Sequence, residues 1–336
     1  MIARKTLFFT APRQVEICEQ PLLTPDAGQV LVETILSAIS PGTEMLVYRG
    51  QFPNLPVDAS IASLGGNFAY PLAYGYACVG RVMELGQGVD RSWLDRLVFS
   101  FQPHTSHFTT EIQALLPVPD GISAENACFL PSTETAVNLV QDAAPILGER
   151  VLVLGQGIIG LLTSALLAKF PLESLVCADM FPARRKAALA LGAVAALDPA
   201  DPDFQLQAQQ FLKAGADLTL EISGAPAALN AAIALTAFSG RIVIGSWYGE
   251  KRAPLDLGGS FHRSRIRLIS SQVSTIAPEL SGRWDKARRF DLSWEMLAQI
   301  QPAGWITQRY PFEQACQAYN LLDETPGEAI QMIFNY

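Results

Sequence analysis

The chain has little positive charge, few cysteines and no long apolar run. Lys and Arg total 24 against 32 Asp and Glu, which gives a net charge of −8 over 336 residues. This balance argues against a nucleic-acid partner, because binding to phosphates needs clustered positive charge. Apolar stretches such as residues 157–168 are shorter than the roughly 20 residues of a membrane-spanning helix. We therefore expect neither a nucleic-acid surface nor a membrane segment, and a small molecule as the partner.

The cysteines are scattered and form no Cys-x-x-Cys pair; they are Cys18, Cys78, Cys128, Cys177 and Cys316. The first residues lack the apolar stretch of a signal peptide, so a reducing, cytoplasmic location is expected. Apolar residues make up 49% of the chain, which is typical of a globular enzyme. At this length we expect two domains.

The predicted secondary-structure pattern changes near residue 123. Before it, short alternating segments such as 29–36 and 78–86 are separated by Pro and Gly, which predicts a β-rich, barrel-like domain. After it, apolar strands at 150–154 and 174–178 alternate with helical segments at 158–169 and 183–191. This alternation predicts an α/β domain with a doubly wound parallel sheet.

A glycine-rich motif follows the first of these apolar strands and opens a helix. It reads Gly155-Gln156-Gly157-Ile158-Ile159-Gly160. The first glycine permits a tight turn, the second lets a pyrophosphate approach the backbone, and the third lets helix and strand pack closely. A Gly-rich turn that merely joins strand to helix is the alternative, but the motif's context favours a dinucleotide site.

Asp179 ends the next strand, 19 residues beyond Gly160. A carboxylate there binds the adenosine ribose hydroxyls and repels a 2′-phosphate, which favours NAD. Arg184 lies just downstream and could hold a 2′-phosphate, so NADP stays open as the alternative. The basic stretch 261–267 is interpreted as a solvated face, with an anion site as the alternative.

Several segments together resemble the medium-chain dehydrogenase/reductase superfamily, which includes the zinc alcohol dehydrogenases and quinone reductases. They are Gly42-Thr43-Glu44, Tyr74-Gly75-Tyr76-Ala77, the glycine motif with Asp179, Glu221-Ile222-Ser223-Gly224, 240–245 and Tyr310-Pro311-Phe312-Glu313. The resemblance implies a GroES-like catalytic domain at 1–125 and 270–336, and a Rossmann NAD(P)-binding domain at 126–269. It also implies contacts to the cofactor from Thr135, Ser223, Gly224, Gly245, Ser246 and Trp247.

The zinc positions of that family are changed in this chain. Pro41, or Ser40 if the alignment slips by one, stands where a Cys ligand is found, and Tyr76 replaces the His ligand. No cysteine lies between Cys78 and Cys128, where a structural zinc lobe would need four. Because zinc needs thiolate, imidazole or carboxylate donors, we expect no zinc. Two imidazoles in His104-Thr105-Ser106-His107 could seat a metal instead, although a polar loop is the favoured interpretation.

Without a metal, a side chain must stabilise the developing alkoxide. The candidates are Thr43, which retains the relay hydroxyl, Tyr76, whose phenol should point to the zinc position, Glu134 and Glu44. Glu134 would act as a proton donor if it lay in an apolar pocket, although a helix-start carboxylate is the favoured interpretation. Tyr76 could instead only fill space, and the favoured interpretation of Glu44 is a structural residue paired with a cation.

The leading hypothesis is a zinc-independent NAD(P)-linked oxidoreductase acting on an alcohol/carbonyl pair. Segment 40–44 resembles the branch named for bacteriochlorophyllide hydroxyethyl dehydrogenase, which implies a planar, ring-containing substrate. Aromatic residues that could line its pocket, with core packing as the favoured alternative, are Phe68, Tyr70, Tyr74, Trp247 and Tyr248. The alternatives are a C=C reductase of quinones or enones, and a non-catalytic nucleotide-binding protein. The resemblance also implies a homodimer.

Overall fold

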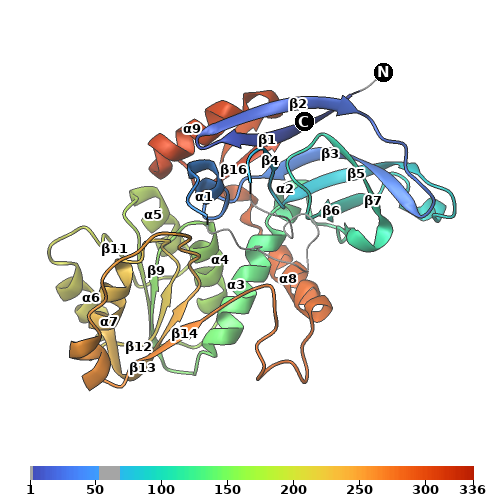
Figure 1. The fold of residues 1–336 in the computed structure, drawn as a ribbon. Helices are drawn as coiled ribbons and strands as arrows, with labels where there is room; N and C mark the ends of the chain where they lie inside the picture. Colours follow the sequence, from blue (N-terminus) through green and yellow to red (C-terminus); the bar gives the residue numbers. More distant parts are fainter. Residues whose placement is uncertain (1–2, 53–68) are drawn as a thin grey trace. The chain divides into compact units, whose positions relative to one another are not determined.

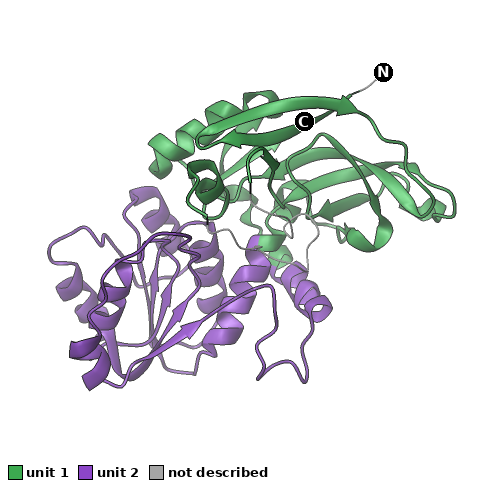
Figure 2. Cartoon of the chain, in the orientation of Figure 1, with its two compact units in different colours: residues 1–131, 297–336 green, residues 132–296 purple. Residues whose placement is uncertain are grey.

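The computed structural model describes residues 3–52 and 69–336, which fold into two compact units (Figure 1). Unit 1 comprises residues 1–131 and 297–336, and unit 2 comprises residues 132–296 (Figure 2). Residues 270–296, which the sequence assigned to the catalytic domain, belong to unit 2. Their helix α8 (Lys286–Ile300) is tied to α3 (Leu130–Ala143), because Lys286 and Arg289 both bind Glu134. No helix of the described residues combines the length and the apolar character that crossing a membrane would need.

Unit 1 is β-rich, as predicted. Its strands are β1 (Ala3–Ala11), β2 (Gln14–Pro21), β3 (Gln29–Ala38), β4 (Leu72–Ala73), β5 (Cys78–Leu85), β6 (Leu97–Ser100), β7 (His107–Glu111), β8 (Leu116–Pro117), β15 (Ile306–Pro311) and β16 (Gln331–Asn335). A small sheet has the order β2-β1-β4, and a larger one has the order β15-β16-β3-β5-β6-β8, with β7 paired to β3. The short helices α1 (Glu44–Arg49), α2 (Ala124–Ala127) and α9 (Ala315–Glu324) accompany these sheets (Figure 1).

The long strand β3 organises unit 1, because it pairs with β5, β7 and β16. Its inward residues Val30 and Val32 pack with Val82 and Phe108 in one apolar cluster. A second cluster is aromatic and gathers residues from both ends of the chain; it includes Phe9, Tyr48, Tyr74, Phe312, Tyr319 and Phe334. This second cluster therefore joins the C-terminal segment to the N-terminal strands.

Unit 2 contains a parallel six-stranded sheet with the order β11-β10-β9-β12-β13-β14. The strands are β9 (Arg150–Leu154), β10 (Ser174–Ala178), β11 (Ala195–Leu197), β12 (Ala216–Glu221), β13 (Thr236–Ile244) and β14 (Arg267–Ser270). The central strands β9 and β10 are buried along nearly their whole length, as expected for strands covered on both faces. This strand order is that of a Rossmann domain.

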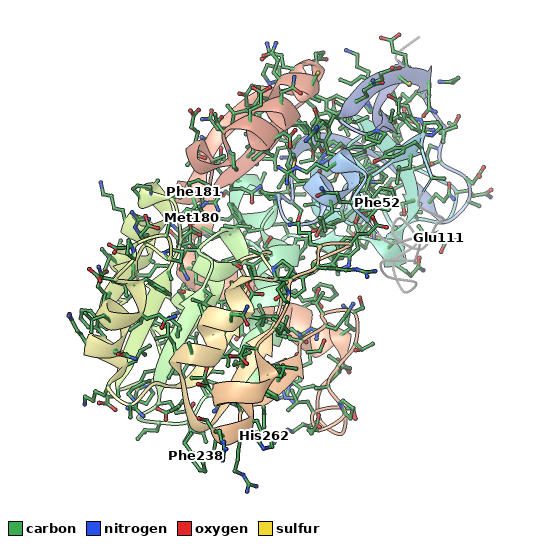
Figure 3. The ribbon with its side chains drawn as sticks, turned by 60° about the vertical axis from the view of Figure 1, so that its left-hand side comes forward. Phe52, Glu111, Met180, Phe181, Phe238 and His262 are labelled. Carbon is green, nitrogen blue, oxygen red and sulfur yellow. The ribbon has the colours of Figure 1, made fainter. Side chains whose placement is uncertain are left out.

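Helices cover the sheet of unit 2 in pairs. Helix α4 (Ile158–Leu167) packs with α5 (Pro182–Ala190), and α6 (Phe204–Leu212) packs with α7 (Ala228–Leu235). Met180 and Phe181 follow β10 at the carboxyl end of the strands, whereas Phe238 and His262 lie at the opposite end (Figure 3). The carboxyl end of such a sheet is where ligands bind, so the candidate cofactor residues are sought there.

Candidate active site

Three hydroxyl groups meet in unit 1, where the turn after β3 leads into α1. The Tyr76 phenol shares its one hydrogen between Ser40 Oγ and Thr43 Oγ1, the latter at 3.3 Å. The turn is closed by the backbone N–H groups of Thr43 and Glu44, which both donate to the Ser40 carbonyl. The structure thus brings together Tyr76 and Thr43, which the sequence proposed as catalytic, and adds Ser40 to them.

The environment of Tyr76 keeps its phenol neutral. Burial among protein groups raises the pKa of Tyr76 to about 12, and the nearby charge of Glu44 acts in the same direction. The hydrogen bonds with Ser40 and Thr43 oppose this pKa shift without cancelling it. At neutral pH Tyr76 therefore rests as a protonated hydrogen-bond donor.

Glu44 does not face these hydroxyls with a free carboxyl group. It is fully buried, and its Oε1 accepts the Ser40 backbone N–H at 2.8 Å. Its Oε2 accepts from His104 Nε2 at 2.9 Å and from the Tyr319 hydroxyl at 2.5 Å. Both oxygens are thus engaged, which agrees with the structural role that the sequence favoured for Glu44 over a catalytic one. His104 and Tyr319 were missed as its partners.

The donor set at the family's zinc positions does not fit a metal. Ser40 and Tyr76 are bonded to one another, Pro41 offers no donor, and Glu44 and His104 are buried together as a pair. In residues 3–52 and 69–336, no group of three His, Cys, Asp or Glu side chains is placed to hold a metal ion. The paired-histidine alternative fails as well, because His104 bonds to Glu44 whereas His107 bonds to Ser106. We derive no catalytic step through zinc from this donor set.

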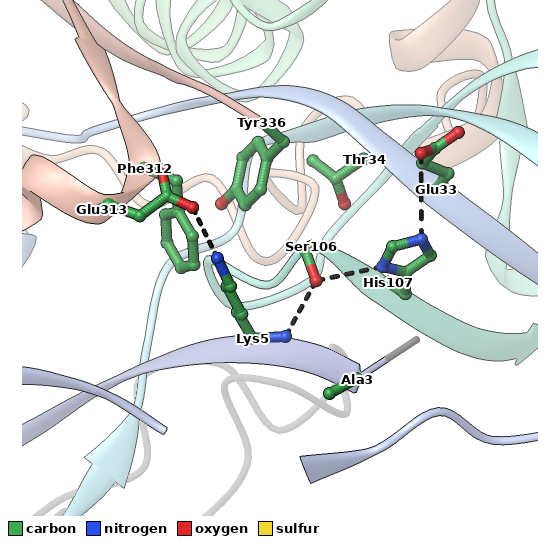
Figure 4. Close-up of a pocket in the computed structure, with 9 residues that line it drawn as sticks. All are labelled: Ala3, Lys5, Glu33, Thr34, Ser106, His107, Phe312, Glu313 and Tyr336. Carbon is green, nitrogen blue, oxygen red and sulfur yellow. Dashed lines mark hydrogen bonds and ion pairs between the residues drawn. The ribbon is translucent and has the colours of Figure 1, made fainter. Parts of the chain in front are cut away.

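A separate cavity of about 200 Å³ lies elsewhere in unit 1 (Figure 4). Lys5 and Glu313 form an ion pair at its rim, and His107, Thr34 and Tyr336 line it. None of the predicted catalytic residues is among its lining groups. Tyr336 nevertheless links this cavity to the interior, since its hydroxyl is 2.9 Å from Ser37 Oγ.

The glycine motif of unit 2 forms the predicted turn between β9 and α4. Gly155 has a left-handed backbone with φ of 95°, and a Cβ there would lie 2.6 Å from Ser223 Cα. A Cβ on Gly160 would lie only 2.0 Å from the Gly155 carbonyl oxygen. Neither position accepts a side chain, whereas the space beside Gly157 is open apart from the Arg184 guanidinium. Ile158 and Ile159 then begin α4, whose N-terminal N–H groups suit a pyrophosphate.

Asp179 fastens this turn from the neighbouring strand. Its carboxylate accepts the backbone N–H of Gln156 at 2.7 Å and that of Phe181 at 2.9 Å. Arg184 lies over the Phe181 ring with its NH1 atom 3.9 Å from the carboxylate. Desolvation lowers the pKa of Arg184, while Asp179 acts in the opposite direction. Asp179 and Arg184 therefore lie beside the glycine turn, where the sequence placed both.

The loops after β12 and β13 are neighbours, because these two strands pair in the sheet. The Gly224 N–H donates to Ser246 Oγ at 2.9 Å, which joins the two loops. The buried Glu221 carboxylate accepts from the Ser223 N–H at 2.9 Å and from the Tyr248 hydroxyl. The predicted cofactor residues Ser223, Gly224, Gly245, Ser246 and Trp247 thus share this carboxyl edge. Glu221 was not predicted to hold these loops.

Three of the aromatic residues considered for a ring pocket are engaged inside their own units. Tyr74 is buried in the aromatic cluster of unit 1, and Tyr70 donates to the Val47 carbonyl. The Tyr248 hydroxyl donates a hydrogen bond to the Glu221 carboxylate, and Phe68 lies outside the described residues. Core packing, the favoured alternative, is confirmed for Tyr74.

Glu134 lies on α3 in an environment that contradicts the predicted apolar pocket. Its Oε1 accepts from Lys286 Nζ at 2.8 Å and from Arg289 Nε and NH2 at 3.0 and 2.8 Å. Arg289 is itself fully buried and also bonds to Asn138. This carboxylate therefore anchors α3 to α8, and the apolar pocket considered for a proton donor is not formed around it. The neighbouring Thr135 remains partly exposed on the same helix.

Comparisons with known proteins agree with this architecture. A family model described as zinc-binding dehydrogenase matches residues 159–290. The D-guloside 3-dehydrogenase of Escherichia coli K12 is 25% identical over 98% of this chain and 99% of its own. A crystal structure of an alcohol dehydrogenase from E. coli CFT073, in complex with NADH, has a TM-score of 0.79 at 18% identity and covers 99% of both chains. A protein from Sinorhizobium meliloti 1021, described as a zinc-binding dehydrogenase bound to NADP, has a TM-score of 0.78 at 16% identity and covers 100% of both chains.

The GroES-like and Rossmann units, the glycine turn and these relatives define a class. The chain is similar along nearly its whole length to dehydrogenases of the medium-chain dehydrogenase/reductase kind. It is an NAD(P)-dependent dehydrogenase of the alcohol dehydrogenase-like kind, as the sequence predicted.

Proposed function

We propose that the protein is a zinc-independent dehydrogenase that transfers hydride between a nicotinamide and an alcohol/carbonyl pair. The observation that carries this proposal is the Tyr76 phenol, which donates to Ser40 and Thr43 in place of a metal ligand set. Donors aimed at a developing oxyanion can replace a Lewis acid, because they stabilise the same negative charge.

The dinucleotide, when bound, supplies or accepts the hydride; the protein must handle the proton. Tyr76 donates to the Ser40 and Thr43 oxygens, so the hydrogens of those two hydroxyl groups remain to bind the substrate oxygen. During reduction the alkoxide formed is more basic than a phenol whose pKa is about 12. A proton then moves from Ser40 to the substrate oxygen and from Tyr76 to Ser40, and solvent restores the phenol. Oxidation of the alcohol follows the reverse order.

The proposed dinucleotide is NAD. Asp179 lies beside the glycine turn with a carboxylate that is 7% exposed, and its charge opposes a 2′-phosphate. Arg184 is held near Asp179 and over Phe181, so it is partly neutralised as a phosphate ligand. In the unit 2 cradle, Gly157, Ile158 and Ile159 would hold the pyrophosphate, and Ser223, Gly224 and Ser246 would hold the nicotinamide end.

The proposed substrate is a secondary alcohol of a polyol or sugar, or its ketone. Support comes from the relatives, which include a D-guloside 3-dehydrogenase and an L-galactonate-5-dehydrogenase. The planar ring-containing substrate stays a prediction that the same experiment covers. Product analysis with a panel of polyols, cyclic alcohols, ketones, enones and quinones tests the reaction type. Turnover of alcohols and ketones supports the proposal, whereas turnover confined to enones or quinones makes the protein a C=C reductase.

The proposal includes a homodimer formed through β14. This strand ends the sheet of unit 2 and has a neighbour, β13, on one side among the described strands. Leu268 on this strand is 37% exposed, so an apolar side chain would be available for contact with a second copy. An open edge of this kind offers backbone groups to a second copy.

A further inference from the structure

A line of hydrogen bonds runs through the interior of unit 1 to the Ser40 turn. The Tyr336 hydroxyl lies 2.9 Å from Ser37 Oγ, and Ser37 Oγ lies 2.7 Å from His104 Nδ1. His104 Nε2 lies 2.9 Å from Glu44 Oε2. Ser37, His104 and Glu44 are each fully buried, while Tyr336 lines the cavity of Figure 4.

Glu44 is the point at which this line meets the proposed active site. Its second oxygen accepts the Ser40 N–H at 2.8 Å, and Ser40 Oγ is one of the two acceptors of the Tyr76 phenol. A buried carboxylate is stable only when donors satisfy it, and here they are the Ser40 N–H, the Tyr319 hydroxyl and His104 Nε2. A backbone N–H does not pass on a proton, so Glu44 acts on the hydroxyls through their position.

The His104 ring is fixed in one orientation from all sides. Ser37 holds Nδ1, Glu44 holds Nε2, and the Phe334 ring meets it edge-on with centroids 5.1 Å apart. A Cβ on Gly75, whose φ is 125°, would lie 2.8 Å from His104 Cδ2. The glycine next to Tyr76 is therefore required by the imidazole that packs against it.

We propose that His104 is a positioning residue, which holds Glu44 in place and so fixes Ser40 and Thr43 as acceptors of the Tyr76 phenol. The inference rests on the proposed function of this hydroxyl cluster. It requires that Nε2 of His104 carries a hydrogen, because only a donor can face the Glu44 carboxylate. Ser37 and Tyr336 orient the ring through Nδ1.

Two matched substitutions separate the two ring nitrogens. In His104→Gln the amide NH₂ falls near the place of Nε2 and still donates to Glu44; in His104→Asn the amide falls near Nδ1 and Glu44 loses its donor. We expect kcat to fall about 10- to 100-fold in His104→Asn and to stay within about threefold in His104→Gln. NAD binding, which depends on unit 2, should be equal in both variants. His107→Gln, three residues away and outside the line, is the control.

Equal losses of kcat in the two folded variants, or the larger loss in His104→Gln, would overturn the inference. A readout free of catalysis is the ¹⁵N spectrum of the imidazole rings, since the chain has only 3 histidines and single substitutions assign them. At pH 7 we expect a hydrogen on Nε2 of His104, and a bare Nε2 would refute the geometry. This spectrum decides the inference even if no alcohol is turned over, in which case the proposed function alone fails.

Discussion

Removing the Tyr76 hydroxyl should slow the reaction and leave cofactor binding intact. In the structure this phenol makes two hydrogen bonds, to Ser40 and Thr43, and it is the most acidic of the three hydroxyl groups. Loss of a donor in direct contact with an oxyanion costs about 10²- to 10³-fold in kcat, or about 2.7–4 kcal/mol, and Tyr76 acts one hydroxyl further away, through Ser40 and Thr43. Because Ser40 and Thr43 still have hydrogens to donate in Tyr76→Phe, we expect the lower end, about 100-fold.

The assay is steady-state reduction of a ketone followed by the absorbance of NADH, together with NADH affinity measured by fluorescence. Tyr310→Phe, which removes a phenol from β15 in the same unit, is the matched control and should keep its kcat. A Tyr76→Phe variant with full kcat would refute the idea that the phenol supplies the proton. A variant that loses NADH affinity and kcat together would refute the assignment of Tyr76 to the chemical step.

Four further predictions follow from the structure. Glu134→Gln should lower the free energy of unfolding by about 3 kcal/mol in urea titrations, because it leaves the buried Arg289 without its carboxylate; a large loss of kcat at unchanged stability would restore a catalytic role. Burial raises the pKa values of four tyrosines above 10, namely Tyr74, Tyr76, Tyr319 and Tyr336. The free energy of unfolding should therefore be highest below pH 10 and fall as pH rises toward 12, less steeply in Tyr76→Phe. Unfolding free energies that stay level from pH 9 to 11 would contradict this. Asp179→Ser should reduce the preference for NADH over NADPH in kcat/KM, and an unchanged ratio would argue against its contact to the ribose. Light scattering should give the mass of a dimer that Leu268→Arg converts to monomer; a monomeric wild type would remove the β14 interface.

Local patterns made most of unit 2 predictable. Strands 150–154 and 174–178 are confirmed with the same bounds, because each is a short apolar run buried on both faces and bounded by turn residues. The glycine turn is recognised from its local pattern, although the contact that requires Gly155 comes from Ser223 at the end of β12. Asp179 is found beside it because parallel strands bring their carboxyl ends to one edge.

The supporting contacts of the hydroxyl cluster depend on residues far apart in the sequence. Glu44 bonds to His104 at a separation of 60 residues and to Tyr319 at a separation of 275. No spacing or periodicity encodes such a pair, so the sequence could assign Glu44 a structural role beside some cation but could not name its partners. The histidine at position 104 was visible in the sequence, but only the fold shows that it is buried against Glu44.

The environment of Glu134 also depends on residues far away in the sequence. The sequence left open whether Glu134 lies in an apolar pocket near the nicotinamide or is a helix-start carboxylate, and it favoured the second. Lys286 and Arg289, which lie 152 and 155 residues away in the sequence, contact the Glu134 carboxylate and exclude the apolar pocket. A residue's ionisation depends on the charges that tertiary structure brings to it.

Metal analysis of the active protein tests the central claim most directly. The donor set of Ser40, Thr43 and Tyr76 predicts that preparations with full ketone reductase activity contain far less than one zinc per chain and keep that activity after dialysis against a chelator. One tightly held zinc per chain, with activity that disappears on its removal and returns on its addition, would contradict the account.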